Sequence, residues 1–252
     1  MPKSYESTGT EAEFLAQYKR EQDTYAKPSV TVDSVIFRYH AGQVELLLIK
    51  RKNHPFMGKF ALSGGFVEEQ EDLDDAVRRE VKEETNVDLT PEQIEQLITV
   101  GTPHRDPRMW IISVSYLCYL GYEEAQTIQA GDDAASIHWV TPQLVDGKLK
   151  LFYDGQELSR KDLAFDHWDI LTTAMERIKG RLEYYPTILQ IMPEEATLST
   201  FRQLFGTFNQ DYLAMDSTNF LRRFKHIFEK TGRKVATRTK NASTYRYTIR
   251  QK

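Results

Sequence analysis

Apolar and polar residues alternate in several short runs along the first part of the chain, a pattern typical of half-buried β-strands. Residues 29–39 and 43–50 form two such runs, and the turn His40-Ala41-Gly42 between them predicts a β-hairpin. Shorter runs predict further strands at residues 59–63, 98–101, 110–120 and 136–140. One helical pattern interrupts the strands, with an apolar stripe of Leu73, Ala76, Val77 and Val81. Strands interleaved with one long helix predict a mixed α/β sandwich.

The N-terminal extension, residues 1–27, is predicted to contain an accessory helix. Thr10 and Glu13 have the spacing of a helix cap, and the helical pattern continues to about residue 23. The side of this helix that packs inward is expected to carry Phe14, Leu15 and Tyr18.

A longer helix is predicted to join the two halves of the chain. Asp166 has the position of its N-cap, Asp169 is the capping partner three residues later, and the helix ends near Gly180. We expect it in a linker region, residues 161–195, that follows a first domain over residues 28–160.

The last part of the chain, residues 196–252, has a different pattern. After a first short helix, a second one is predicted from Asp216 to residue 231, and Gly232 would end it. The buried stripe of this second helix is expected to consist of Phe220, Leu221, Phe224, Ile227 and Phe228. Alternating residues at 234–239 and 243–249 then predict a β-hairpin. Helix, turn, helix and hairpin together predict a winged helix-turn-helix domain.

Charge is distributed unevenly between these halves. The formal net charge is −4, but residues 197–252 contain twelve Lys and Arg against three acidic residues, a local charge of +9 that leaves −13 for the rest. A basic module on an acidic body is typical of nucleic-acid binding. The candidates for reading base edges are Thr218, Asn219, Arg222 and Arg223. The candidates for phosphate contacts are Lys225, Lys234, Arg238, Lys240 and Arg246. A solvated helical face in a scaffold domain is the alternative.

Three carboxylates gather on one face of the helix in the sandwich. Glu80, Glu83 and Glu84 are spaced i, i+3 and i+4, and like charges at this spacing cost a free helix about 0.2–0.5 kcal/mol per pair. A cation among them would remove this cost, and oxygen ligands favour a hard ion such as Mg²⁺. Gly64 and Gly65, just before the helix, allow the backbone to approach a ligand closely. A solvated acidic face is the alternative.

Basic and aromatic residues on both sides of this stretch suit a nucleotide. Arg51, Phe56 and Lys59 precede it, whereas Arg105 and Arg108 lie in a proline-containing loop that follows it. Arginine can bind phosphate oxygens through two N–H groups at once, so the two loop arginines are candidates for binding a pyrophosphate. The alternative is that both arginines are solvated and that Phe56 belongs to the core.

The same stretch resembles the Nudix box. The matching residues are Gly65, Glu71, Arg79, Glu80, Val81, Glu83, Glu84 and Val87, and Asn86 stands where the family has Gly. Asn tolerates the left-handed conformation at a helix C-terminus, so the loop–helix–loop geometry should survive. The resemblance implies the Nudix α/β/α sandwich fold and a brace between Arg79 and Glu71. It also implies that divalent metal binding and any catalytic role belong to Glu80, Glu83 and Glu84.

A Nudix box followed by a winged helix-turn-helix resembles the Nudix-related transcriptional regulators of NAD metabolism. That resemblance implies a homodimeric repressor of genes for NAD synthesis or salvage, which binds a palindromic duplex operator and leaves it when ADP-ribose binds. The alternative is a Mg²⁺-dependent hydrolase that splits ADP-ribose into AMP and ribose 5-phosphate, with a general base from Glu123, Glu124, Asp132 or Asp133. A third interpretation is a housekeeping hydrolase whose tail binds RNA or protein. We expect a sensor with little or no turnover.

The composition argues against several other classes of protein. No apolar run reaches the roughly 18 residues of a membrane span, and the polar N-terminus does not resemble a signal peptide. The one cysteine, Cys118, lies in an apolar run and is expected to be a buried, unreactive thiol. Six histidines without paired cysteines give no zinc signature. We expect a cytoplasmic protein with no membrane partner.

Overall fold

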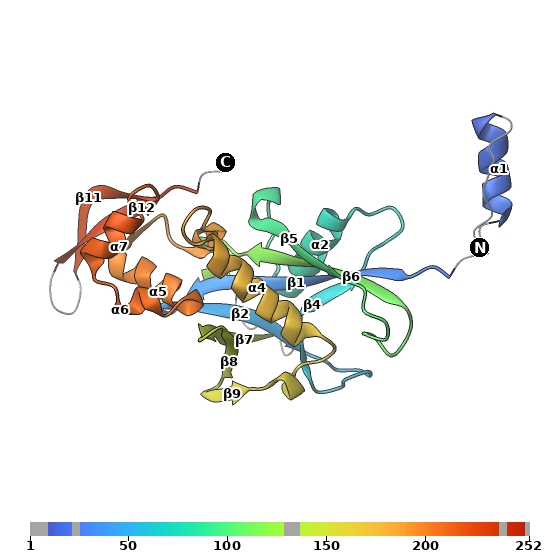
Figure 1. The fold of residues 1–252 in the computed structure, drawn as a ribbon, viewed down its shortest axis with the longest axis horizontal. Helices are drawn as coiled ribbons and strands as arrows, with labels where there is room; N and C mark the ends of the chain where they lie inside the picture. Colours follow the sequence, from blue (N-terminus) through green and yellow to red (C-terminus); the bar gives the residue numbers. More distant parts are fainter. Residues whose placement is uncertain (1–9, 22–25, 129–136, 237–240, 250–252) are drawn as a thin grey trace.

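A mixed sheet is the centre of the computed structural model, which describes residues 10–21, 26–128, 137–236 and 241–249. Within these ranges the strand order is β5-β6-β1-β2-β7-β8-β9, with β3 paired to β2 and β4 to β1 (Figure 1). The strands are β1 (Ser29–His40), β2 (Gln43–Lys50), β3 (Phe60–Ala61), β4 (Ser63–Phe66), β5 (Ile94–Val100), β6 (Ile111–Tyr119), β7 (Ile137–Val145), β8 (Lys148–Tyr153) and β9 (Gln156–Leu158). β1 and β6 run parallel, whereas β1 and β2 form the predicted antiparallel hairpin. The mixed sheet predicted from the sequence is therefore confirmed.

Helices cover both faces of this sheet. In the described part of the chain the α-helices are α1 (Glu11–Glu21), α2 (Leu73–Thr85), α3 (Tyr122–Thr127), α4 (His167–Arg181), α5 (Leu198–Phe208), α6 (Asp211–Ala214) and α7 (Ser217–Arg223). Short 3-10 helices are η2 (Pro91–Gln93), η4 (Arg160–Asp162) and η5 (Thr187–Ile191). The alternation along β1 sends Val32 and Ile36 towards α2 and sends Val35 and Phe37 into the cluster that contains α4. This arrangement is the predicted α/β/α sandwich.

α4, predicted as a linker helix, is also the second helical layer of the sandwich. It buries Ile170, Leu171, Ala174, Met175 and Ile178 in the same hydrophobic cluster as the sheet. The cluster continues into the C-terminal part of the chain, where the rings of Phe37 and Phe208 lie 6.2 Å apart. Figure 1 shows α4 running diagonally across the sheet towards that part. Because one core spans both regions, the boundaries predicted at residues 160 and 196 stay a prediction.

The C-terminal unit, by which we mean β10 to β12, contains α5, α6, α7 and a small sheet. Its strands are β10 (Glu195–Thr197), β11 (Phe228–Ala236) and β12 (Asn241–Tyr247), in the order β10-β12-β11. The prediction of a second helix that reaches residue 231 is wrong, because α7 ends at Arg223 and Phe228 already pairs with Tyr247 in the sheet. Gly232, with a φ of +81°, lies within β11 at a register shift instead of ending a helix. The spacing of the apolar residues fitted a longer helix, because Phe224 and Phe228 are buried whether the segment is helical or extended.

The N-terminal helix α1 begins as predicted and packs differently. Thr10 and Glu13 form the expected cap, with the Thr10 N–H donating to Glu13 over 2.8 Å. Leu15 and Tyr18 are 47% and 45% exposed, so their predicted inward orientation is wrong. In Figure 1, α1 stands apart from the sheet. Of the helices in the described residues, none combines the length and the apolar character that crossing a membrane needs.

Candidate functional site

The loop and helix of the Nudix box have the caps that their sequence predicts. The Asp72 carboxylate accepts hydrogen bonds from the N–H groups of Asp74 and Asp75, over 2.8 Å and 3.3 Å, and so starts α2. Asn86 follows the last turn in the left-handed conformation, with φ 57° and ψ 21°. Its N–H donates to the Lys82 carbonyl over 2.7 Å. The substitution of Gly by Asn therefore leaves the end of the helix intact.

Arg79 holds the box together. Its Nε and one Nη donate to the two oxygens of Glu71 over 2.8 Å and 3.0 Å, which is the predicted brace. The same guanidinium donates to Glu80 over 2.7 Å and to Glu83 over 3.3 Å. Gly65 closes over this network, since a Cβ at that position would lie 2.1 Å from a Glu80 oxygen. A side chain at this glycine would force the Glu80 carboxylate to move.

The Glu80, Glu83 and Glu84 carboxylates form an electrostatically strained group. Burial raises the pKa of Glu80, Arg79 opposes that rise, and the charge of Glu83 adds to it. Burial also raises the pKa of Glu84, and the charges of Glu80 and Glu83 raise it further. Oxygen donors with raised pKa values suit a hard divalent cation, which would relieve their repulsion. Among the described residues no three acidic, His or Cys side chains are gathered closely enough to hold a metal, so these three ligands stay a prediction.

Glu84→Gln is expected to raise the unfolding midpoint near pH 7, in buffer containing a chelator, by about 1–2 °C, because it removes a half-buried charge and its like-charge neighbours. A raised pKa of Glu84 means that the folded state prefers the neutral carboxyl. The charged carboxylate therefore lowers the free energy of unfolding once the pH rises above the ordinary pKa of a Glu side chain. The difference from wild type, followed by thermal unfolding, should disappear near pH 4. Glu69→Gln, at an exposed position of the preceding loop, is the control. A rise of the same size at both pH values would contradict the electrostatic explanation.

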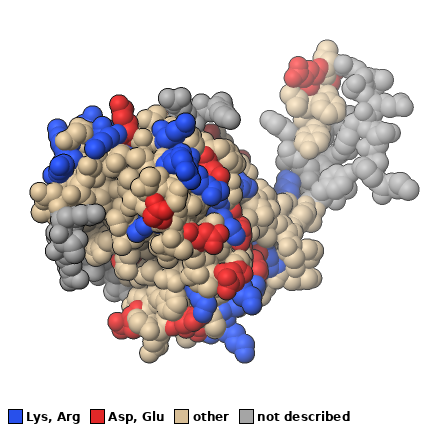
Figure 2. Space-filling model, turned by 60° about the vertical axis from the view of Figure 1, so that its left-hand side comes forward, with Lys and Arg blue, Asp and Glu red and all other residues tan. Residues whose placement is uncertain are grey.

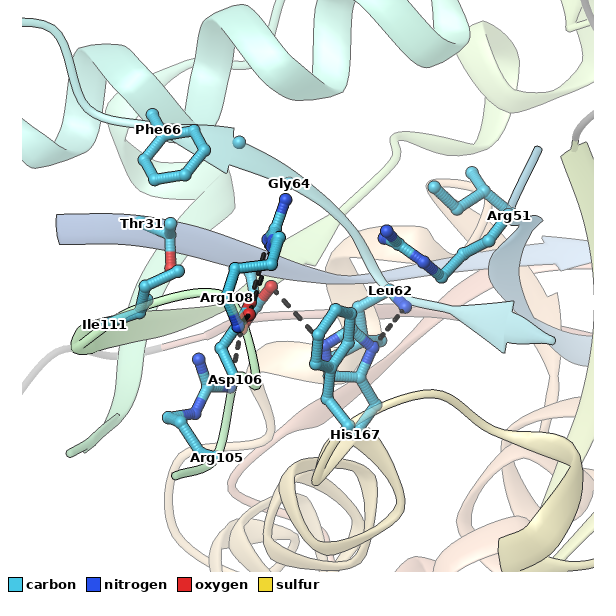
Figure 3. A pocket seen from close by; sticks show the side chains of 14 residues that line it. Thr31, Arg51, Leu62, Gly64, Phe66, Arg105, Asp106, Arg108, Ile111 and His167 are labelled. Carbon is cyan, nitrogen blue, oxygen red and sulfur yellow. Dashed lines mark hydrogen bonds and ion pairs between the residues drawn. The ribbon is translucent and has the colours of Figure 1, made fainter. Parts of the chain in front are cut away.

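A cavity of about 200 Å³ lies beside the box. Five predicted ligand-binding residues line it, namely Arg51, Gly64, Gly65, Arg105 and Arg108. Figure 3 shows Arg51 and His167 on one side of this pocket and Arg108, Asp106 and Arg105 on another. Four predicted residues lie outside its lining, namely Phe56, Lys59, Glu71 and Arg79. The Lys59 ammonium donates to the Lys161 carbonyl over 2.6 Å, and Phe56 packs edge-on against Phe165, a pocket residue, with ring centroids 4.8 Å apart.

The two loop arginines already bind carboxylates. Arg105, with a side chain only 5% exposed, donates two parallel hydrogen bonds to Asp166, over 2.9 Å and 2.6 Å. Arg108 donates two to Asp106, over 3.0 Å and 2.8 Å, and stays 41% exposed. Arg108 is therefore open to a ligand, whereas Arg105 chiefly ties its loop to α4. The side-chain cap predicted for Asp166 is wrong, because its carboxylate binds Arg105 instead of the first turn of α4.

Asp33 and His167 line the pocket, although the sequence did not predict them as site residues. Asp33 on β1 is a buried carboxylate that accepts a hydrogen bond from the Ser113 hydroxyl. His167, the first residue of α4, is also buried, and its Nδ1 accepts the Leu62 N–H over 2.9 Å. Burial lowers the pKa of His167, against the opposing influence of Asp33. A charged residue inside the apolar alternation of β1 was the available signal for Asp33; no local pattern marked His167.

The N-terminal end of α4 forms part of the pocket wall. Phe165, just before the helix, has a φ of +51° and lies under the Arg51 guanidinium at 4.9 Å. Asp166 binds Arg105, and His167 binds the Leu62 backbone. Three consecutive residues thus fix the start of α4 to three different pocket segments.

The helix α7 presents polar side chains to solvent at its start. Asp216 accepts hydrogen bonds from the N–H groups of Thr218 and Asn219, each over 2.9 Å. The Arg222 guanidinium donates to the Asn219 side-chain oxygen over 2.7 Å. Figure 2, which brings the C-terminal unit forward, shows groups of Lys and Arg side chains over the upper part of this face. Thr218, Asn219, Arg222 and Lys225 are all exposed.

Other predicted DNA contacts have internal partners or lie outside the described residues. Arg223 is bound to Glu183, which follows α4 and also accepts a hydrogen bond from the Tyr212 hydroxyl over 3.0 Å. Arg246 pairs with Glu195 at 3.1 Å, whereas Lys234 is exposed. Arg238 and Lys240 lie outside the described residues, so their predicted DNA contacts cannot be placed.

Of the four candidates for a general base, Asp132 and Asp133 also lie outside the described residues, and Glu123 and Glu124 are exposed on α3.

Comparison with known proteins gives consistent matches. The sequence profile of the NUDIX domain matches residues 27–161. The ADPR responsive transcriptional repressor NtrR of Acinetobacter baylyi is 31% identical over 245 residues, which are 95% of this chain and 89% of that protein. The ADP-ribose pyrophosphatase of Methanocaldococcus jannaschii is 40% identical over 157 residues, 62% of this chain and 78% of that protein. The solved structure of Shewanella oneidensis NrtR complexed with a 27mer DNA has a TM-score of 0.67 at 32% identity, covering 87% of this chain and 93% of that one.

Some of these relatives match only the Nudix domain, whereas others match nearly the whole chain. The domain profile and the pyrophosphatase match account for the sandwich and its box. The repressor matches nearly the whole chain, and the DNA-bound structure matches most of it, including parts beyond the domain profile. The chain belongs to the Nudix family, in the group of Nudix-related transcriptional regulators.

Proposed function

We propose that this chain is a cytoplasmic, homodimeric repressor of genes of NAD metabolism, which binds ADP-ribose in the pocket and then releases a palindromic operator. The observation that carries the proposal is the physical link between the two regions: the wall of the pocket is the start of the helix that leads to the C-terminal unit. The ADP-ribose response and the DNA complex of the two relatives support the two ends of this link.

α4 supplies the route between the sites. A helix of fifteen residues spans about 22 Å, and it begins at His167, directly after Asp166, which binds Arg105. Just beyond its other end, Glu183 holds Arg223 and Tyr212 of the C-terminal unit. A ligand shifts such a system only if it binds one arrangement better than another. We propose that ADP-ribose alters the tilt of α4, so that the α7 helices of two copies no longer match half-sites about 34–36 Å apart on DNA.

In this proposal α5 to α7, β11 and β12 act as a winged helix-turn-helix with α7 as the recognition helix. The exposed N-terminal residues of α7 and the basic character of residues 197–252 support that role. Two measurements test the proposal. Footprinting on duplexes that the chain selects from a random pool should show a two-fold symmetric site, and ADP-ribose at about 100 times its Kd should stabilise the fold by roughly 2.7 kcal/mol. Uniform protection of every duplex would contradict operator recognition.

Arg222→Ala is expected to weaken binding to the selected duplex by about 1–3 kcal/mol if the guanidinium reads a guanine, and to weaken binding to random duplex much less. Lys225→Ala, three residues later and also exposed, should weaken both duplexes alike because it would contact phosphate. Fluorescence anisotropy at fixed salt measures both ratios. If Arg222→Ala lowers the affinity for both duplexes equally, Arg222 contacts a phosphate and not a base.

Hydrolysis of ADP-ribose is the second candidate, favoured by the complete set of box carboxylates and by the Methanocaldococcus relative. Glu80, Glu83 and Glu84 would hold Mg²⁺, which supplies a Lewis acid for the phosphoryl oxygens. The raised pKa of Glu84 supports a place for a cation there. Incubation of ADP-ribose with the protein and Mg²⁺, followed by chromatography, tests this candidate. Release of AMP by the wild type, abolished in Glu84→Gln, would establish that the protein is an enzyme. If ADP-ribose stays intact, only the sensor function remains.

A further inference from the structure

The pocket contains one hydrogen-bond donor and one acceptor that face each other without touching. His167 accepts the Leu62 N–H at Nδ1, so its remaining ring proton must be on Nε2. That Nε2 lies 3.7 Å from Oδ1 of Asp33, too far for a hydrogen bond. The other oxygen of Asp33 receives the Ser113 hydroxyl and lies 3.5 Å from Arg105. Both His167 and Asp33 line the cavity.

A single hydroxyl group can satisfy both of these atoms. A hydroxyl donates one hydrogen bond and accepts others, so it can donate to Asp33 and accept from His167 at the same time. The lowered pKa of His167 keeps the ring neutral, with its Nε2 proton available. Both atoms belong to buried residues that line the cavity, so a ligand hydroxyl that supplies both interactions is favoured.

The charges of the pocket also orient the ligand. The buried Asp33 carboxylate would repel a phosphate, whereas the partly exposed Arg108 lies across the pocket from His167 (Figure 3). The pyrophosphate of a nucleotide sugar would therefore lie towards Arg108, and an uncharged sugar would lie at Asp33. We infer that Asp33 and His167 form a hydroxyl-recognition site, which selects ligands carrying a free ribose hydroxyl at the end of the pocket remote from the phosphates. This inference rests on the proposed binding of ADP-ribose.

The test compares three ligands by calorimetry in the presence of a chelator: ADP-ribose, ADP without the second ribose, and ADP-ribose with a 2′-deoxyadenosine. Hydrogen bonds to charged groups contribute enough that the wild type should bind at least one of the latter two tenfold or more weakly than ADP-ribose. Asp33→Asn should narrow that preference to about threefold or less. If the preference over ADP becomes smaller, Asp33 binds the second ribose. If the preference over the 2′-deoxyadenosine analogue becomes smaller, Asp33 binds the ribose of the adenosine.

Glu45→Gln is the matched control, since the Glu45 side chain is 11% exposed like that of Asp33 but pairs with Arg38 away from the pocket. It should keep the wild-type preference. Equal wild-type affinity for all three ligands would overturn the inference even if Asp33→Asn did not fold, and so would an unchanged preference in a folded Asp33→Asn. Absence of ADP-ribose binding by the wild type would instead refute the proposed function, and this inference with it.

Discussion

Asp166→Asn is expected to destabilise the protein by about 3 kcal/mol, because it leaves the buried Arg105 without its main counter-charge. For a chain of this size the loss corresponds to a fall of roughly 6–12 °C in the unfolding midpoint. ADP-ribose should also no longer release DNA from this variant, since two hydrogen bonds from Arg105 to Asp166 tie the pocket loop to the start of α4. Thermal unfolding and anisotropy measure the two effects.

The matched control for this variant is Asp169→Asn, three residues further along α4. Asp169 pairs with Arg160, and both side chains are about 60% exposed, so the same chemical change should cost only about 0–1 kcal/mol. Midpoints that fall equally in the two variants would show that burial of Arg105 contributes nothing. Normal release of DNA by ADP-ribose in Asp166→Asn would remove the pair from the route between the sites.

Phe205→Ala is expected to cost about 3–5 kcal/mol, the largest effect of any single substitution considered. Phe205 is fully buried and lies against the rings of Phe220 and Phe224, at 5.6 Å and 5.0 Å, beneath α7. Loss of this ring should abolish DNA binding because the support of the recognition helix collapses. The pocket is remote from it, and ADP-ribose binding below the lowered unfolding midpoint should persist.

Val235→Ala serves as the control for Phe205→Ala, because Val235 is 43% exposed on β11. It should change stability by less than about 0.5 kcal/mol. Calorimetric unfolding with and without ADP-ribose compares the two variants. A Phe205→Ala protein that keeps wild-type DNA affinity would contradict the role of this aromatic cluster in holding α7.

Local signals account for what the sequence predicted well. Asp72 and Asn86 bound the box helix through contacts within a few residues. The Arg79–Glu71 brace was implied by the resemblance to the Nudix box, and its two residues are only eight positions apart. The hairpin of β1 and β2 has an equally local turn. The length of α7 was not predictable in this way, because pairing of β11 with β12 decides where the helix stops.

Long-range contacts account for what the sequence missed. Asp33 and His167 are far apart in the chain and meet only because α4 packs on the face of the sheet that Asp33 points to. Arg105 was predicted to bind phosphate, yet the structure pairs it with Asp166, 61 residues away. No periodicity reports such a partner. Arginines that sequence patterns assign to ligands can therefore be the residues that join a site to the rest of the fold.

Affinity for the selected operator, measured with and without saturating ADP-ribose, tests the central claim most directly. Coupling between two sites of this kind is typically about 5- to 150-fold, and by linkage the operator must weaken ADP-ribose binding by the same factor. We predict at least a tenfold loss of operator affinity in a chelator-containing buffer, where the effector stays intact. Operator affinity that is unchanged while ADP-ribose demonstrably occupies the pocket would contradict the account.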